Sequence, residues 1–118
     1  PMEVPSLRAF CLGLPGAWPD HPFGEDLLTL KVHDKIFAFV GEETLGVKSA
    51  LTRDVADEWL LRYPESARPM PYLGRSGWNQ LDLAGEIPDD ELREAVEESY
   101  RLVVSRLAVR HRPAGWDA

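Results

Sequence analysis

Two consecutive apolar runs separated by a two-residue turn are the feature of this sequence that most restricts its fold. In the first run, residues 27–32, apolar and polar residues alternate from Leu28 onward, as expected of a strand with one buried face. The second run, residues 36–40, is apolar throughout, which is typical of a central strand covered on both sides. His33 and Asp34 lie between the runs, where a tight hairpin turn belongs. The two runs therefore predict an antiparallel hairpin inside a larger sheet.

Other periodic segments predict three helices and further strands. The expected order is α-β-β-β-α-β-β-α, with helices over about residues 5–12, 53–63 and 89–109 and strands at 27–32, 35–40, 45–48, within 64–77 and at 78–83. The last helix begins with acidic residues and ends with arginines, which opposes the helix dipole favourably. We therefore expect an α+β fold of two layers, an antiparallel sheet with helices packed on one face, in a single domain spanning residues 1–118.

Composition agrees with one globular domain. The chain has 118 residues, of which 44% are hydrophobic and 28% charged. A chain of this size can form a stable hydrophobic core without disulfides or bound metals. Pro1 precedes Met2 and is interpreted as an addition before the native start, and the last few residues are expected to be loose. The single cysteine, Cys11, excludes an internal disulfide, and no apolar run approaches the roughly 20 residues that span a bilayer. These features predict a cytoplasmic protein without a membrane partner.

The formal net charge of -7 argues against a generally basic, nucleic-acid-binding surface, but it allows a local basic patch. Such a patch needs cations that displace counterions from phosphates and aromatic rings on which bases stack. The candidates for nucleic-acid contact are Lys31, Lys35, Lys48, Arg68, Tyr72, Arg75 and Trp78. The alternative interpretation is that the lysines keep an exposed sheet soluble, while a loop or the last helix covers Trp78.

Other polar clusters favour structural explanations. The arginines between residues 101 and 112 are interpreted as partners of the helix dipole in preference to a phosphate-binding tail. The acids between residues 89 and 98 radiate from a helix, and the three histidines have no metal-type spacing, so no metal or cofactor is expected. Cys11 is interpreted as a small buried hydrophobe. Because no catalytic motif is present, we assign no catalytic residues and expect no enzyme activity.

Several short segments, in order, resemble the MmcQ/YjbR-like family from about Leu7 to Arg112. They are residues 12–16, 22–24, 31–38, 47–48, 69–72, 77–78 and the closing Ser99, Tyr100, Val103 and Val104. The resemblance implies a two-layer fold with an antiparallel sheet and helices on one side, described as a double wing. It also implies DNA binding, and it carries no enzymatic motif. Family members often have glycines at the first hairpin turn, so His33 and Asp34 predict a stiffer and less basic tip here.

Two hypotheses of function follow. The first is a non-catalytic DNA-binding domain of this family. The second is a protein or small-ligand interaction module that uses the open face of the sheet, possible partners being another protein or a second copy in a homodimer. If Phe37, Phe39 or Trp78 reaches that face, it would form an apolar patch with a polar rim.

Overall fold

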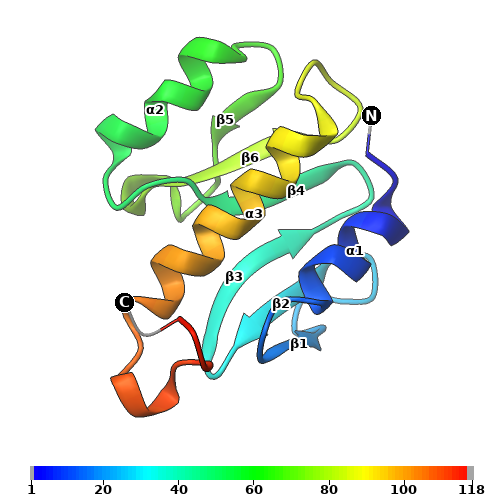
Figure 1. The fold of residues 1–118 in the computed structure, drawn as a ribbon. Coiled ribbons are helices and arrows are strands. Elements are labelled where there is room, and N and C mark those ends of the chain that lie inside the picture. The colour runs from blue at the N-terminus through cyan, green and yellow to red at the C-terminus, as the bar shows by residue number, and fades with distance from the viewer. Residues whose placement is uncertain (1, 117–118) are drawn as a thin grey trace.

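The computed structural model describes residues 2–116, which form three α-helices and one six-stranded antiparallel sheet (Figure 1). The sheet order is β1-β2-β3-β4-β6-β5. The elements are α1 (Val4–Leu12), β1 (Ala17–Asp20), β2 (Leu28–Val32), β3 (Lys35–Val40), β4 (Thr44–Lys48), α2 (Arg53–Arg62), β5 (Ala67–Pro69), the 3₁₀ turn η1 (Gly74–Ser76), β6 (Trp78–Asp82), α3 (Asp89–Val104) and the 3₁₀ turn η2 (Val109–His111). This arrangement confirms the α+β prediction.

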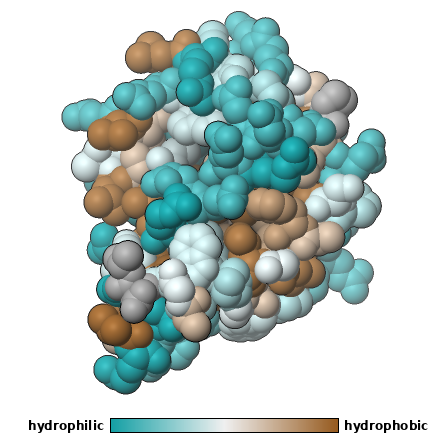
Figure 2. All heavy atoms as spheres, viewed as in Figure 1, coloured by the Kyte–Doolittle hydropathy of each residue, from teal (hydrophilic) through white to brown (hydrophobic). Residues whose placement is uncertain are grey.

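The helices form a single layer against one face of the sheet. Helices α1 and α3 pack on β2 and β3, and α3 also packs on β4 (Figure 1). Helix α2 lies over β5 and β6, where the Asn79 side chain donates a hydrogen bond to the Ala56 carbonyl at 2.9 Å. On this side of the molecule the surface is mostly hydrophilic, with separate hydrophobic patches (Figure 2). Within residues 2–116, no helix combines the length and apolar character needed to cross a membrane.

One strand and one helix end differ from the sequence prediction. The sequence analysis assigned no strand to β1. This strand contains Pro19, but it lies at the edge of the sheet, where the missing N–H of proline disrupts no ladder. Helix α3 ends at Val104, not near residue 109, because the chain tightens into turns there. The Arg112 guanidinium closes this end by donating hydrogen bonds to the carbonyl oxygens of Ser105 and Leu107. The last few residues were expected to be loose, and two of them, residues 117–118, lie outside the described residues.

The hairpin turn and the sheet interior follow the sequence pattern closely. His33 adopts a positive φ of 54°, as a tight turn between β2 and β3 requires. Phe37 is fully buried on the helix side, where its ring meets the Tyr100 ring edge-on at 5.2 Å between centroids. Phe37 therefore does not reach the open face. Phe39 and Trp78 lie on that face and contact each other, with ring centroids 5.5 Å apart.

Strands β3 and β4 pair along only part of their length. The last pair in the direction of Lys48 is Ala38 with Val47. Beyond it, α3 inserts the hydroxyl of Ser99, which donates to the Phe37 carbonyl at 2.7 Å and accepts from the Lys48 backbone N–H at 2.9 Å. Because this hydroxyl replaces a direct backbone hydrogen bond, the strand ends diverge. The divergence makes room for a cavity at this end of the sheet.

Candidate functional site

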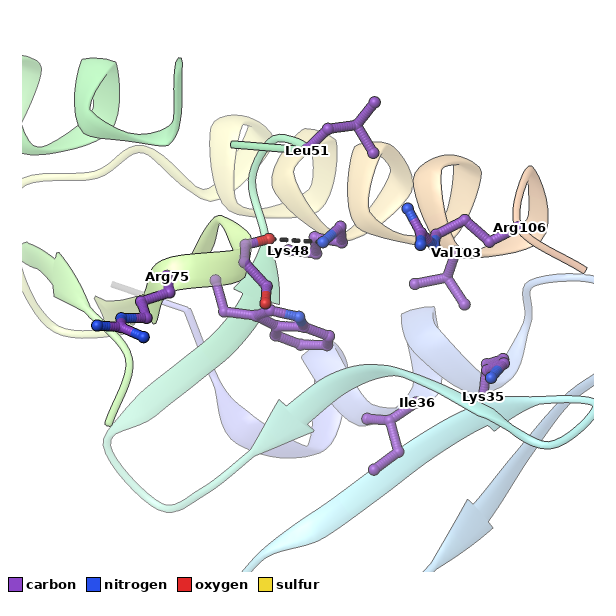
Figure 3. A pocket seen from close by; sticks show the side chains of 9 residues that line it. Lys35, Ile36, Lys48, Leu51, Arg75, Val103 and Arg106 are labelled. Carbon is purple, nitrogen blue, oxygen red and sulfur yellow. Dashed lines mark hydrogen bonds between the residues drawn. The ribbon is translucent and has the colours of Figure 1, made fainter. Parts of the chain in front are cut away.

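A cavity of about 510 Å³, the basic pocket, lies where β3 and β4 separate (Figure 3). It is lined by Lys35, Ile36, Lys48, Leu51, Arg75, Ser76, Trp78, Val103 and Arg106. Its cations come from four places in the chain: the start of β3, the end of β4, η1 and the turn after α3. In Figure 3, Lys48 lies at the centre of the view with Arg106 and Lys35 to its right, and Arg75 lies at the left with its guanidinium directed away from them. The fold thus concentrates positive charge that is dispersed in the sequence.

The turn that carries Arg75 and Ser76 depends on a glycine. Gly77 ends η1 with a positive φ of 89°, and a Cβ built on it would lie 2.0 Å from the Ala50 carbonyl oxygen. Only glycine fits such a close backbone approach. The Gly77 carbonyl also accepts a hydrogen bond from the Ser49 N–H at 2.8 Å. These contacts fix η1 beside the end of β4 and place Ser76 next to Lys48.

Lys48 is the buried cation of the basic pocket, with 8% of its surface exposed. Its ammonium donates a hydrogen bond to the Ser76 carbonyl oxygen at 2.5 Å (Figure 3). Desolvation by burial lowers the pKa of Lys48, and repulsion from Arg106 lowers this pKa further. No Asp or Glu is among the described residues that line the pocket, and Lys48 has no ion-pair partner among them. An ammonium that is poorly solvated and unpaired is stabilised by an incoming anion.

The structure separates the seven residues expected to contact nucleic acid into two groups. Lys35, Lys48, Arg75 and Trp78 line the basic pocket. The other three, Lys31, Arg68 and Tyr72, lie elsewhere. The Lys31 ammonium is 3.0 Å from the Asp20 carboxylate, and the Arg68 guanidinium is 2.8 Å from that of Asp82. Their charges are therefore neutralised locally.

The ring of Trp78 forms a wall of the basic pocket but offers little area for a base to stack on. Only 8% of Trp78 is exposed, and its ring packs edge-on against Phe39. The interpretation that the chain covers this side chain therefore agrees with its burial. Contact with a ligand in this pocket would be made mainly by cations.

Sequence reasoning missed Arg106, whose charge was assigned to the helix dipole together with its neighbours. Arg101 does pair with Glu98 at 2.9 Å, and Arg112 does bind carbonyl oxygens at the end of α3. Arg106 instead follows the last helical turn and lines the basic pocket. The available signal was the absence of any acid between residues 101 and 112, which left this arginine without a local partner.

The cysteine and the histidines of the described chain lie outside the basic pocket. Burial raises the pKa of the Cys11 thiol to about 12, as expected of a small buried hydrophobe. The rings of His33 and His111 stack with centroids 3.9 Å apart. Across residues 2–116, no group of three or more His, Cys, Asp or Glu side chains is placed to hold a metal ion.

The family model named YjbR matches residues 12–102 of the chain. The chain belongs to the YjbR family. The Escherichia coli proteins described as "Uncharacterized protein YjbR", from strains K12 and O157:H7, are each 29% identical to it over 112 residues. The alignment covers 94% of this chain and 95% of each relative. The family resemblance found in the sequence is thereby confirmed.

Solved structures from two bacteria show the same fold. Deinococcus radiodurans protein DR2400, described as a DUF419 domain, aligns with a TM-score of 0.81 and 24% identity over 92% of this chain and 84% of that one. A protein from Pseudomonas syringae aligns with a TM-score of 0.70 and 16% identity over 86% of this chain and 99% of that one. These likenesses concern the fold, and DNA binding by this chain stays a prediction.

Proposed function

We propose that this member of the YjbR family binds the phosphate groups of nucleic acid in the basic pocket and that it does so without catalysis. The observation that carries the proposal is the convergence of Lys35, Lys48 and Arg106, with Arg75 at the edge, in a cavity whose described lining includes no carboxylate. Phosphate oxygens are strong acceptors for such cations.

The burial of Lys48 supports this proposal through its energetics. A buried ammonium whose pKa is lowered by desolvation is held at some cost to stability. A bound phosphate would reduce this cost by supplying the missing counter-charge. The net charge of -7 opposes long-range attraction of DNA, so binding must depend on this local cluster. We therefore expect modest affinity, with a log–log salt slope no steeper than about -3.6, because at most four cations can each neutralise one phosphate at about -0.9.

The lining of the basic pocket favours binding over chemistry. The described lining residues contain no His, Cys, Asp or Glu that could serve as a general base. Lys48, the one lining group with a lowered pKa, directs its ammonium to a backbone carbonyl oxygen and not to a hydroxyl that it could activate. We accordingly propose a binding role for the pocket.

Fluorescence anisotropy with labelled duplex and single-stranded DNA, at about 20 mM and about 150 mM salt, tests this function. The double variant Lys35→Ala/Arg106→Ala is expected to weaken binding at least about tenfold at low salt, because it removes two phosphate contacts. The matched control is Arg68→Ala/Arg93→Ala, which removes the same charge from residues outside the pocket.

Two results would reject the proposal. One is the absence of DNA binding by the unmodified protein even at low salt. The other is an equal loss of affinity in both double variants, which would show that net charge, and not the basic pocket, governs binding.

A further inference from the structure

A second cavity, of about 550 Å³, lies on the sheet face that the helices leave uncovered. We call it the apolar pocket. Its floor is formed by β3, β4 and β6, and its sides by two loops that fold over these strands. The apolar side chains around it include Phe23, Leu27, Phe39, Met70, Tyr72 and Leu73. Cavities of roughly 300–1,000 Å³ with such linings are typical of small-molecule sites.

The floor of the apolar pocket depends on Gly46. A Cβ built at this position would lie 2.9 Å from the Met70 sulfur and 3.3 Å from the Phe39 Cβ. The missing side chain therefore lets the loop of residues 70–73 approach β4. On the opposite side, the Phe23 ring lies 6.2 Å from the Phe39 ring, between centroids. The strands and both loops together create a concave apolar surface.

The polar groups of the apolar pocket are few and uncharged. Among the described lining residues, they come from the side chains of Thr44 and Gln80 on the strands and from the Tyr72 hydroxyl at the edge. The Gln80 amide nitrogen donates to the Thr44 hydroxyl oxygen at 3.2 Å. The Gln80 amide oxygen has no hydrogen-bond partner among residues 2–116 and can accept a bond from a ligand. Because no charged side chain of the described chain lines this cavity, it does not favour an ionic ligand.

Tyr72 has an unusual conformation at the edge of the apolar pocket. Its φ is 68°, and the Leu73 N–H bonds to the Pro71 carbonyl at 2.8 Å, which closes a three-residue turn around it. A γ-turn with positive φ is rare and strained, especially for a bulky residue. The side chain is also fully exposed, at 102%. A strained backbone that holds an aromatic ring in water beside an apolar cavity points to a ligand that the ring would cover.

We propose that the apolar pocket binds an uncharged, largely aromatic small molecule that carries a single hydrogen-bond donor. Its rings lie against Phe23, Phe39 and Met70, its donor bonds to the Gln80 amide oxygen, and Tyr72 covers it. A second copy of the chain is the less suitable occupant. Two copies each carry a net charge of -7 and repel each other, and a stable interface needs about 800 Å² per partner, far more than one such cavity.

The test uses N-phenyl-1-naphthylamine, a neutral aromatic fluorophore with one N–H donor. It is titrated into the full chain, and its fluorescence is expected to rise to saturation. Tyr72→Gly removes the ring and relieves the positive φ, so this variant folds and is expected to bind the probe at least about tenfold more weakly. Tyr72→Phe keeps the ring and is expected to bind it unchanged. Leu61→Ala, at an exposed position on α2, is the matched surface control and is also expected to bind it unchanged.

A charged analogue tests the expected ligand class. The 8-sulfonate of the same fluorophore is expected to fail to displace the neutral probe, because the apolar pocket offers its charge no partner. The variant Lys35→Ala/Arg106→Ala, altered in the basic pocket, is expected to bind the neutral probe normally. This result would separate the present inference from the proposed nucleic-acid function.

Four outcomes would overturn the inference. The first is the absence of saturable probe binding, and the second is equal probe binding by Tyr72→Gly and the unmodified chain. The third is efficient displacement of the probe by the sulfonate, and the fourth is a loss of probe affinity in Leu61→Ala equal to that in Tyr72→Gly. Sedimentation velocity completes the test. Self-association that disappears in Tyr72→Gly would assign the face to a second copy, and this too would overturn the small-molecule proposal.

Discussion

The basic pocket and the apolar pocket are built on the same strands but present opposite chemistry. Both use residues of β3, β4 and β6, and their volumes are similar, about 510 and 550 Å³. The basic pocket opens where strand ends diverge and receives cations from the elements around it. The apolar pocket lies over the paired part of the strands, where loops add aromatic and aliphatic side chains. Local pairing of two strands, more than overall composition, therefore determines which chemistry each region supports.

The contact between Phe39 and Trp78 separates the two cavities. Phe39 lines the apolar pocket, and Trp78 lines the basic pocket. Their rings meet edge-on at 5.5 Å between centroids, and both side chains are buried. Edge-to-face contact of this kind adds roughly 0.5–1.5 kcal/mol beyond simple burial. The basic pocket and the apolar pocket are therefore separated by this single pair of aromatic rings.

The largest expected effect comes from Ser99, whose hydroxyl bridges the diverging strands. Ser99→Ala leaves the Phe37 carbonyl and the Lys48 N–H buried without their partner. We expect the free energy of unfolding to fall by about 2–4 kcal/mol, since each buried unsatisfied group costs about 1–3 kcal/mol. Urea denaturation measures this loss. The control Ser105→Ala removes an exposed hydroxyl just beyond α3 and should lower the free energy of unfolding by less than about 0.5 kcal/mol. An equal decrease in both variants would contradict the bridging role of Ser99.

The next effect concerns the charge of Lys48. The folded state lowers its pKa, so at neutral pH the buried ammonium detracts from stability. Lys48→Met removes this charge and is expected to weaken DNA binding about tenfold, which corresponds to about 1.4 kcal/mol. The free energy of unfolding should stay unchanged or rise by up to about 1 kcal/mol. Anisotropy and urea denaturation measure the two quantities. A variant that binds DNA normally but unfolds more easily would give Lys48 a purely structural role.

A smaller effect is expected at Gly46, on the apolar side of the comparison. In Gly46→Ala the new methyl displaces the end of the flexible Met70 side chain. We therefore expect the free energy of unfolding to fall by about 1 kcal/mol. Binding of the neutral probe should weaken, and DNA binding should stay unchanged. Gly41→Ala is the matched control, since its Cβ would make only ordinary contacts at 3.7 Å. Urea denaturation and probe titration compare the variants. Equal behaviour of the two would show that the close approach of Met70 is unimportant.

The smallest effect is a pH dependence from His111. Burial lowers the pKa of His111 below its usual 6.5, with repulsion from His33 and Arg110 adding to it and Asp34 opposing it. The folded state therefore binds this proton less tightly than the unfolded state. Its contribution to stability is present above pH 6.5, the usual pKa, and is lost as the pH falls below 6.5 through the lowered pKa of the folded state. Urea denaturation at about pH 7.5 and 5.5 should show a smaller decrease in His111→Gln than in the control His21→Gln.

The strands and helices of this fold were largely predictable because burial imposes a period on the sequence. The apolar run at residues 36–40 and the stripe that includes Leu92, Val96 and Ser99 both correspond to buried faces. The alternation at residues 28–32 wrongly predicted one exposed face, because Thr29 is fully buried and Lys31 is half-buried. Strand β1 was not predictable in this way, because it is short, half exposed and interrupted by Pro19. Its omission had a further consequence. The partner of Lys31, Asp20, lies on this strand, so the sequence gave no reason to expect that Lys31 is neutralised.

The basic pocket was only half predictable, because it depends on contacts between distant elements. Lys35, Lys48 and Arg75 were candidates because they are cations near strand ends and loops. Arg106 was not, because its place beside the pocket depends on where α3 ends. The bridging role of Ser99 had no signal either, since a serine in an apolar helix stripe gives no information on which strands it joins. Strand divergence is a tertiary property and leaves little trace in local sequence.

The shared wall between the pockets limits how this protein can be redesigned. A smaller side chain at Trp78 would remove the wall between the basic pocket and the apolar pocket and so change both. A larger side chain at Phe39 would push the Trp78 ring toward the cations of the basic pocket. A protein engineer could therefore not tune either recognition surface independently through these two rings. Specificity is more safely altered at the outer edges, where Tyr72 on one side and Arg75 on the other project into solvent.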